Sequence, residues 1–233
     1  MDTLNSYNGK SPLILPKYDI YNADIADTYP IIMLNSSRYN KEIKQALLEI
    51  TKDRTVYIID LSFIPSRYEQ DNLRIEDAPD LLNNFFKVNK IEKSILLTNM
   101  ETFKYGVEIA VSSPRLVEKL VCINPPISPE SFSKSFKTDL KRELRACTIR
   151  ANHSMGAGFI NQQIISVGRV LDTDSIDNSS LTRIKCPVSI AYDESMITND
   201  SIESIVHNLK NADYDKLDLK DVNKLKQFLS NAI

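Results

Sequence analysis

The residues of this chain that could do chemistry are few, and one set of three stands out. Ser154 lies in the stretch Asn152–Gly158, directly after a histidine. His207 is the second of the chain's two histidines, and Asp193 follows an apolar run. A serine becomes a nucleophile when a histidine takes its proton and an acid orients that histidine. The set therefore supports one hypothesis, a serine ester hydrolase or acyltransferase that uses Ser154, His207 and Asp193.

Each member of this set also has an ordinary structural explanation. Residues 141–150 are charged and helix-like, so Ser154 is expected to break or cap a helix rather than to follow a buried strand. His207 is expected to be a partly exposed helix residue. Asp193 is a common type of turn residue after a strand, although open α/β sheets also bind ligands at that end of their strands. The sequence alone leaves both interpretations open.

Composition excludes several classes of function. The 233 residues carry a formal net charge of -2, so we expect no nucleic-acid partner. No apolar run approaches the roughly 20 residues of a membrane span, and the N-terminus lacks the features of a signal peptide. The three cysteines, Cys122, Cys147 and Cys186, are widely spaced and form no CxxC pair, and Cys122 and Cys186 are expected to behave as small buried hydrophobic residues rather than as catalytic thiols. We therefore expect a cytoplasmic protein with no metal site, and the five glycines form no phosphate-binding or dinucleotide motif, so we also expect no cofactor.

Apolar runs alternate with helical periodicity along most of the chain. Strands are expected at residues 18–21, 31–34, 56–61, 94–98, 120–123 and 188–192, and helices are expected at about 43–50, 75–86, 102–111, 201–209 and 222–229. Short strand–helix–strand spacing predicts right-handed crossovers and a mostly parallel sheet. Residues 127–183 interrupt this alternation with a polar, helical pattern, which predicts an inserted helical segment.

This layout resembles the α/β-hydrolase fold over nearly the whole chain. Tyr29–Asn35 resembles the strand that leads to the oxyanion loop, and Ile91–Pro125 resembles the strand–helix–strand unit that carries the nucleophile. Ile184–Val188 is similar to the start of the strand that delivers the triad acid. The resemblance implies a mostly parallel central sheet flanked by helices. It divides the chain into a core of residues 1–126 and 184–233 and a helical cap insertion of residues 127–183.

The nucleophile and oxyanion positions do not match the family. Its Gly-x-Ser-x-Gly elbow aligns with Thr98–Thr102, which reads Thr-Asn-Met-Glu-Thr. Met100 has no acidic proton and cannot act as an acyl nucleophile, and β-branched threonines bring bulk where a tight turn favours glycine. The oxyanion loop, which usually begins His-Gly, begins with Asn35 and Ser36.

The acid and base positions are also altered. The acid position falls on Asp193 or Met196, depending on the register. No histidine follows His207, and positions near Asp213 and Tyr214 are expected where the family has its catalytic histidine. The resemblance therefore implies the scaffold without an intact catalytic triad.

These observations favour a non-catalytic α/β-hydrolase-like protein that binds a small ligand or a protein partner. In the ligand version, Asn35, Ser36, Asn99 and Met100 line the floor of the site. The displaced triad described above is the alternative, and a subunit that stabilises a catalytic homologue is a weaker third hypothesis. Homo- and hetero-oligomers both remain open.

Overall fold

The computed structural model describes residues 15–23, 25, 28–35, 40–61, 78–153, 167, 170 and 175–233. These residues form one sheet of seven strands in the order β1-β3-β2-β4-β5-β6-β7. The strands are β1 (Lys17–Tyr21), β2 (Ile31–Asn35), β3 (Val56–Asp60), β4 (Ser94–Thr98), β5 (Val117–Ile123), β6 (Val188–Tyr192) and β7 (Ala212–Lys216). Only β1 is antiparallel to its neighbour; every other pair is parallel. The mostly parallel sheet is therefore confirmed.

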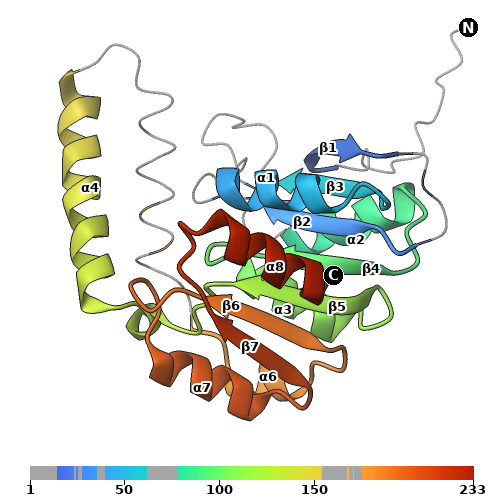
Figure 1. The fold of residues 1–233 in the computed structure, drawn as a ribbon. Helices are drawn as coiled ribbons and strands as arrows, with labels where there is room; N and C mark the ends of the chain where they lie inside the picture. The colour runs from blue at the N-terminus through green and yellow to red at the C-terminus, as the bar shows by residue number, and fades with distance from the viewer. Residues whose placement is uncertain are drawn as a thin grey trace, which may run out of the picture.

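Helices cover both faces of the sheet (Figure 1). They are α1 (Asn40–Ile50), α2 (Ala78–Val88), α3 (Phe103–Ser112), α4 (Lys134–His153), α6 (Asn178–Thr182), α7 (Asn199–Asn208) and α8 (Val222–Ala232), with a short 3-10 helix, η2, at Pro129–Ser131. Helices α1 and α8 cover one face, and α2, α3, α6 and α7 cover the other. Along β2, Ile31 and Met33 belong to the hydrophobic core on the face of α1 and α8. Ile32 and Leu34 belong to the core on the face of α2, α3, α6 and α7. Because side chains of a strand alternate between faces, a continuous apolar run such as this one supplies both cores.

The sequence analysis did not predict β7. Its residues read Ala-Asp-Tyr-Asp-Lys, and most of them are exposed at the edge of the sheet. An edge strand that carries charges has no apolar run to reveal it, and such charges also discourage pairing with another chain. Asp213 and Tyr214 lie within this strand.

Helix α3 lies unusually close to the sheet at Gly106. A Cβ atom at this position would lie 2.5 Å from Thr98 Cγ2 and 3.2 Å from Leu120 Cδ1. Both neighbours are buried side chains of central strands, so neither can move aside freely. The glycine therefore fixes how closely α3 packs against β4 and β5.

The segment between β5 and β6 contains the predicted helices. Phe132, Phe136 and Leu140 are buried in the core cluster that contains α2 and α3, and they anchor the start of α4. Figure 1 shows α4 extending beyond the carboxyl ends of the parallel strands. Ile149, near its other end, is 59% exposed. Helical structure is thus present in this segment, and its role as a cap stays a prediction. None of the helices within the described ranges combines the length and apolar composition that a membrane crossing needs.

Candidate functional site

The bend between β4 and α3 contains Met100. Its side chain is 4% exposed and belongs to the hydrophobic core of that face. The structure therefore places a buried thioether at the turn from the third parallel strand along the chain into the following helix. A thioether carries no proton to lose, so this position cannot supply an acyl nucleophile.

Asn99 and Thr102 hold this bend with hydrogen bonds. Asn99 Oδ1 accepts from the backbone N–H of Glu101 at 3.0 Å and of Thr102 at 3.2 Å. In return, Thr102 Oγ1 accepts from the Asn99 backbone N–H at 3.0 Å, and its own proton can go to Leu34 O or to Asn99 Oδ1, both 3.1 Å away. The buried polar groups that open α3 are thereby satisfied inside the bend.

The bend is built without glycine and without a left-handed backbone. Among the described residues, positive φ occurs at Asn22, Lys90 and Asn124, and Met100 is not one of them. Our expectation that threonine bulk conflicts with this turn is wrong for Thr102, because with an ordinary φ its side chain fits and its hydroxyl bonds the turn together. Asn99 likewise uses its amide oxygen for the turn, which withdraws that oxygen from any ligand.

Asn35 ends β2 next to this bend. Its backbone carbonyl accepts from Leu61 N–H at 2.9 Å. Its side-chain Oδ1 is buried and has no hydrogen-bond partner in the part of the chain that the structure describes. A buried acceptor without a partner is uncommon and calls for an explanation. Ser36, the other predicted residue of this loop, lies outside the described residues.

Asp193 directly follows β6 and is 9% exposed. Its Oδ1 accepts from the backbone N–H and the hydroxyl of Ser195 at 2.9 and 2.6 Å. Its backbone N–H donates to Asn124 Oδ1 at 2.7 Å, and Asn124 also lies 3.1 Å from the sulfur of Met196. Of the two residues predicted for the acid position, the aspartate is thus the one at the end of the strand. Asn124 was not predicted as part of this site; its place at the end of a buried strand, before Pro125, was the available signal.

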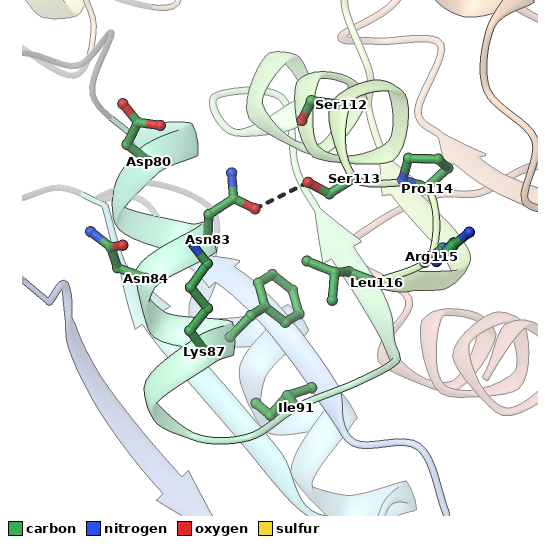
Figure 2. Close-up of a pocket in the computed structure, with 11 residues that line it drawn as sticks. Asp80, Asn83, Asn84, Lys87, Ile91, Ser112, Ser113, Pro114, Arg115 and Leu116 are labelled. Carbon is green, nitrogen blue, oxygen red and sulfur yellow. Dashed lines mark hydrogen bonds between the residues drawn. The ribbon is translucent and has the colours of Figure 1, made fainter.

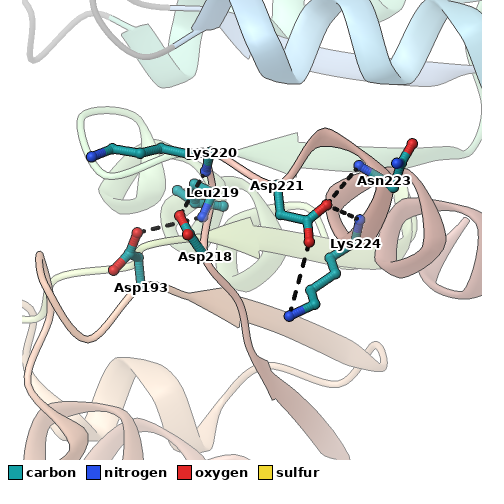
Figure 3. A network of polar contacts seen from close by, with 7 residues as sticks. All are labelled: Asp193, Asp218, Leu219, Lys220, Asp221, Asn223 and Lys224. Atoms are coloured by element: carbon teal, nitrogen blue, oxygen red, sulfur yellow. Dashed lines mark hydrogen bonds and ion pairs between the residues drawn. The ribbon is translucent and has the colours of Figure 1, made fainter.

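The loop between β7 and α8, residues 217–221, lies against this carboxylate. Leu219 donates its backbone N–H to Asp193 Oδ2 at 3.4 Å (Figure 3). The placement of Asp213 and Tyr214 opposite the acid was wrong, because both lie within β7, where Asp213 accepts from Ser189 Oγ at 2.9 Å. The loop that does reach Asp193 contains leucine, aspartate and lysine, and it has no histidine.

His207 is exposed in the last turn of α7. That helix starts soon after the carboxyl end of β6 and runs for 10 residues, or about 15 Å, toward the other edge of the sheet. Shortly after it ends, Asn211 O accepts from Val188 N–H at the beginning of β6. His207 therefore lies toward the amino end of β6 and Asp193 lies at its carboxyl end, so the structure does not bring the two residues together.

Ser154 lies outside the described residues, whereas the helix that precedes it is described. Helix α4 continues to His153, so Ser154 directly follows a 20-residue helix. This agrees with the helix-like pattern expected at residues 141–150. A nucleophile elbow, by contrast, connects a buried strand to a helix.

Two of the three thiols in the described residues, those of Cys122 and Cys186, are poor candidates for a nucleophile. Burial raises the pKa of Cys122 to about 12, and burial also raises the pKa of Cys186. Because the thiolate is the reactive form, both sulfurs are poor nucleophiles near neutral pH. Within the described residues, no group of three or more His, Cys, Asp or Glu side chains could hold a metal ion.

Comparison with known proteins identifies the fold. No protein-family model matches the sequence, and no curated protein matches it either. Solved structures do match. A meta-cleavage product hydrolase from Pseudomonas fluorescens IP01 has a TM-score of 0.67 at 12% identity, covering 93% of this chain and 94% of that one. The enol-lactonase from Burkholderia xenovorans LB400 has a TM-score of 0.65 at 14% identity, covering 92% and 96%.

A third similar structure, Est816, is described as an N-acyl homoserine lactone degrading enzyme. Its TM-score is 0.66 at 12% identity, covering 93% of this chain and 96% of that one. Identities this low establish the shared fold and do not by themselves establish an activity. The agreement extends over nearly the full length of each protein. The chain therefore has the α/β-hydrolase fold.

Proposed function

We propose that this protein is a non-catalytic member of the α/β-hydrolase fold that binds a ligand at the carboxyl ends of β2 and β4. The observation that carries the proposal is Met100, a buried thioether in the bend where acyl-transfer chemistry on this fold needs a nucleophile. The loop facing Asp193 also offers no histidine to act as a base. Two of the three triad roles thus have no candidate at this edge among the described residues.

Asn35 gives the binding site its polar specificity. The Oδ1 atom, which has no partner among the described residues, can accept a hydrogen bond, so a suitable ligand presents an N–H or O–H group to it. Met100 offers a polarizable apolar neighbour from the adjacent strand end. We therefore expect a small molecule with a donor group beside an apolar body. Residues 127–183 complete the site as its cap in this proposal.

The direct test is a screen of ester, amide and thioester substrates together with labelling by a fluorophosphonate probe. The native protein is expected to give no turnover and no labelled serine. Labelling that disappears in the Ser154→Ala variant would overturn the proposal. Heat-denatured protein serves as the background control, because reactive serine sites require the folded state.

A serine hydrolase that uses Ser154 and His207 is the second candidate. The comparisons favour it over the non-catalytic proposal, since the similar structures above are named as hydrolytic enzymes. The position of Asp193 away from His207 weighs against the full set of three. If the enzyme hypothesis holds, Ser154→Ala and His207→Ala both abolish turnover, while Asp193→Asn leaves it nearly unchanged. Loss of turnover in all three variants would instead require a rearrangement that brings Asp193 to the histidine.

A further inference from the structure

Two hollows lie near the amino ends of β4, β5 and β6, away from the site proposed above. The larger, of about 790 Å³, lies between α2 and the turn that joins α3 to β5 (Figure 2). The smaller, of about 450 Å³, lies between the end of α3 and the segments that follow α6 and α7. Pro114 lines both, so the two hollows adjoin at that residue.

The smaller hollow is basic. Arg183, Lys185 and Lys210 line it together with Val111, Pro114, Thr182 and Ile184. No carboxylate is among these lining residues, and the three cations have no ion-pair partner in the described ranges. Glu118, the one acidic residue of β5, forms an ion pair with Lys93. Unpaired cations gathered at one hollow of a chain with a net charge of -2 are a local feature, not a consequence of overall charge.

The larger hollow is mixed in character, and its lining includes one carboxylate, Asp80, and two cations, Lys87 and Arg115. Phe86, Ile91 and Leu116 supply an apolar floor, and Ser113 Oγ donates to Asn83 Oδ1 at 3.1 Å across the gap between α3 and α2. The half-buried Asn84 lies at its rim on α2. An apolar floor with a few fixed polar groups is typical of small-molecule sites.

We propose that these adjoining hollows bind a small organic anion. Its phosphate or carboxylate group lies among Arg183, Lys185 and Lys210, and its uncharged body passes Pro114 into the groove between α2 and the α3–β5 turn. This site is separate from the one at Asn35 and does not depend on the absence of catalysis there. Cations at the ends of helices also complement helix dipoles, and that simpler explanation predicts no ligand.

The experiment is a calorimetric titration of the full chain with phenyl phosphate, inorganic phosphate and benzoate. Phenyl phosphate is expected to bind with a Kd of about 1 mM or tighter, and at least about tenfold more tightly than inorganic phosphate, because only the former reaches the apolar floor. Benzoate distinguishes a phosphate-specific site from one that accepts any organic anion. No saturable binding of either organic anion would overturn the proposal and leave the helix-dipole explanation.

Variants then locate the site. Two double variants are expected to weaken phenyl phosphate binding at least about tenfold. One combines Arg183→Gln with Lys210→Gln, and the other combines Lys185→Gln with Lys210→Gln. The matched control, Lys41→Gln with Lys52→Gln, removes two exposed cations near α1, and less than about a twofold change is expected. Asn84→Trp should fill the groove and abolish the advantage of phenyl phosphate over phosphate. An equal loss in the control pair would show nonspecific charge attraction and would refute the site.

Discussion

The bend after β4 and the loop after β6 both lie at the carboxyl ends of the parallel strands, and they differ in the side chains they carry and in how these are bonded. The bend carries the buried thioether of Met100 and is held by a closed set of hydrogen bonds between Asn99 and Thr102. The loop keeps the acid, Asp193, with its carboxylate accepting from Ser195 and Leu219. One strand end thus presents a carboxylate, and the other presents a thioether.

This difference has a structural explanation. A carboxylate that accepts backbone N–H groups organises its own loop, and that role does not need a reaction. A nucleophile on a strained turn has no comparable structural use, because the strain is tolerated for the chemistry. Where catalysis is absent, a relaxed turn with internal hydrogen bonds is the more stable solution. The comparison therefore predicts that substitutions under and within the bend affect stability more than an isosteric substitution of the acid.

The largest effect is expected beneath the bend, at Gly106. Gly106→Ala should lower the free energy of unfolding by about 3 kcal/mol, because the added methyl meets Thr98 Cγ2 at 2.5 Å in a packed core. Chemical denaturation measures the change. Combined with Thr98→Ser, which removes that methyl group but keeps the hydroxyl bonded to Val121 O, the substitution should be much less harmful. Additive losses in the double variant would show that the close approach at this point is not what requires glycine.

Within the bend itself, Thr102→Val is expected to lower the free energy of unfolding by about 2 kcal/mol. The substitution keeps the shape of the side chain and leaves the buried Asn99 N–H without its acceptor. Thr102→Ser, the matched control, keeps the hydroxyl and loses one methyl group, for which about 1 kcal/mol or less is expected. If the two variants are equally destabilised in denaturant titrations, packing rather than hydrogen bonding holds the bend.

A smaller effect is expected at the acid. Asp193→Asn keeps an oxygen that can accept from Ser195, so its loss of stability should be below about 1 kcal/mol. Asp193→Ala removes the acceptors altogether and should lose more than Asp193→Asn. A thermal or denaturant series on the two variants measures this order. A loss for Asp193→Asn as large as that for Thr102→Val would mean that the charge of Asp193 has a role beyond its loop.

Much of the fold could be predicted from the sequence, because strands such as 94–98 and 188–192 are buried on both faces and read as continuous apolar runs. The edge strand β7 could not, since its charged residues hide it. Because β7 was not predicted, the segment that approaches Asp193 was expected near Asp213. The structure places Leu219 there instead. The position of Met100 at this bend was implied by the resemblance of Thr98–Thr102 to the family's nucleophile elbow. The bonding of Asn99 and Thr102 was not, because it depends on backbone angles that the residue types do not determine.

The smallest effect is expected from Met100→Cys, which places a thiol in the bend. The site is 4% exposed, and burial of this kind raises a thiol pKa, as it does at Cys122. No histidine faces the bend from the loop at Leu219 to take the proton, so the new thiol should be neither nucleophilic nor quickly alkylated. Iodoacetamide labelling of the folded variant, followed by mass spectrometry, should match the wild-type pattern, with the denatured variant as the positive control. Rapid labelling at residue 100 in the folded protein would mean that the bend opens to solvent and presents its side chain as a catalytic elbow does. In that case the inactivity we propose would depend on the thioether of Met100 alone. The burial of the bend and the lack of a histidine in the loop at Leu219 would not contribute to it.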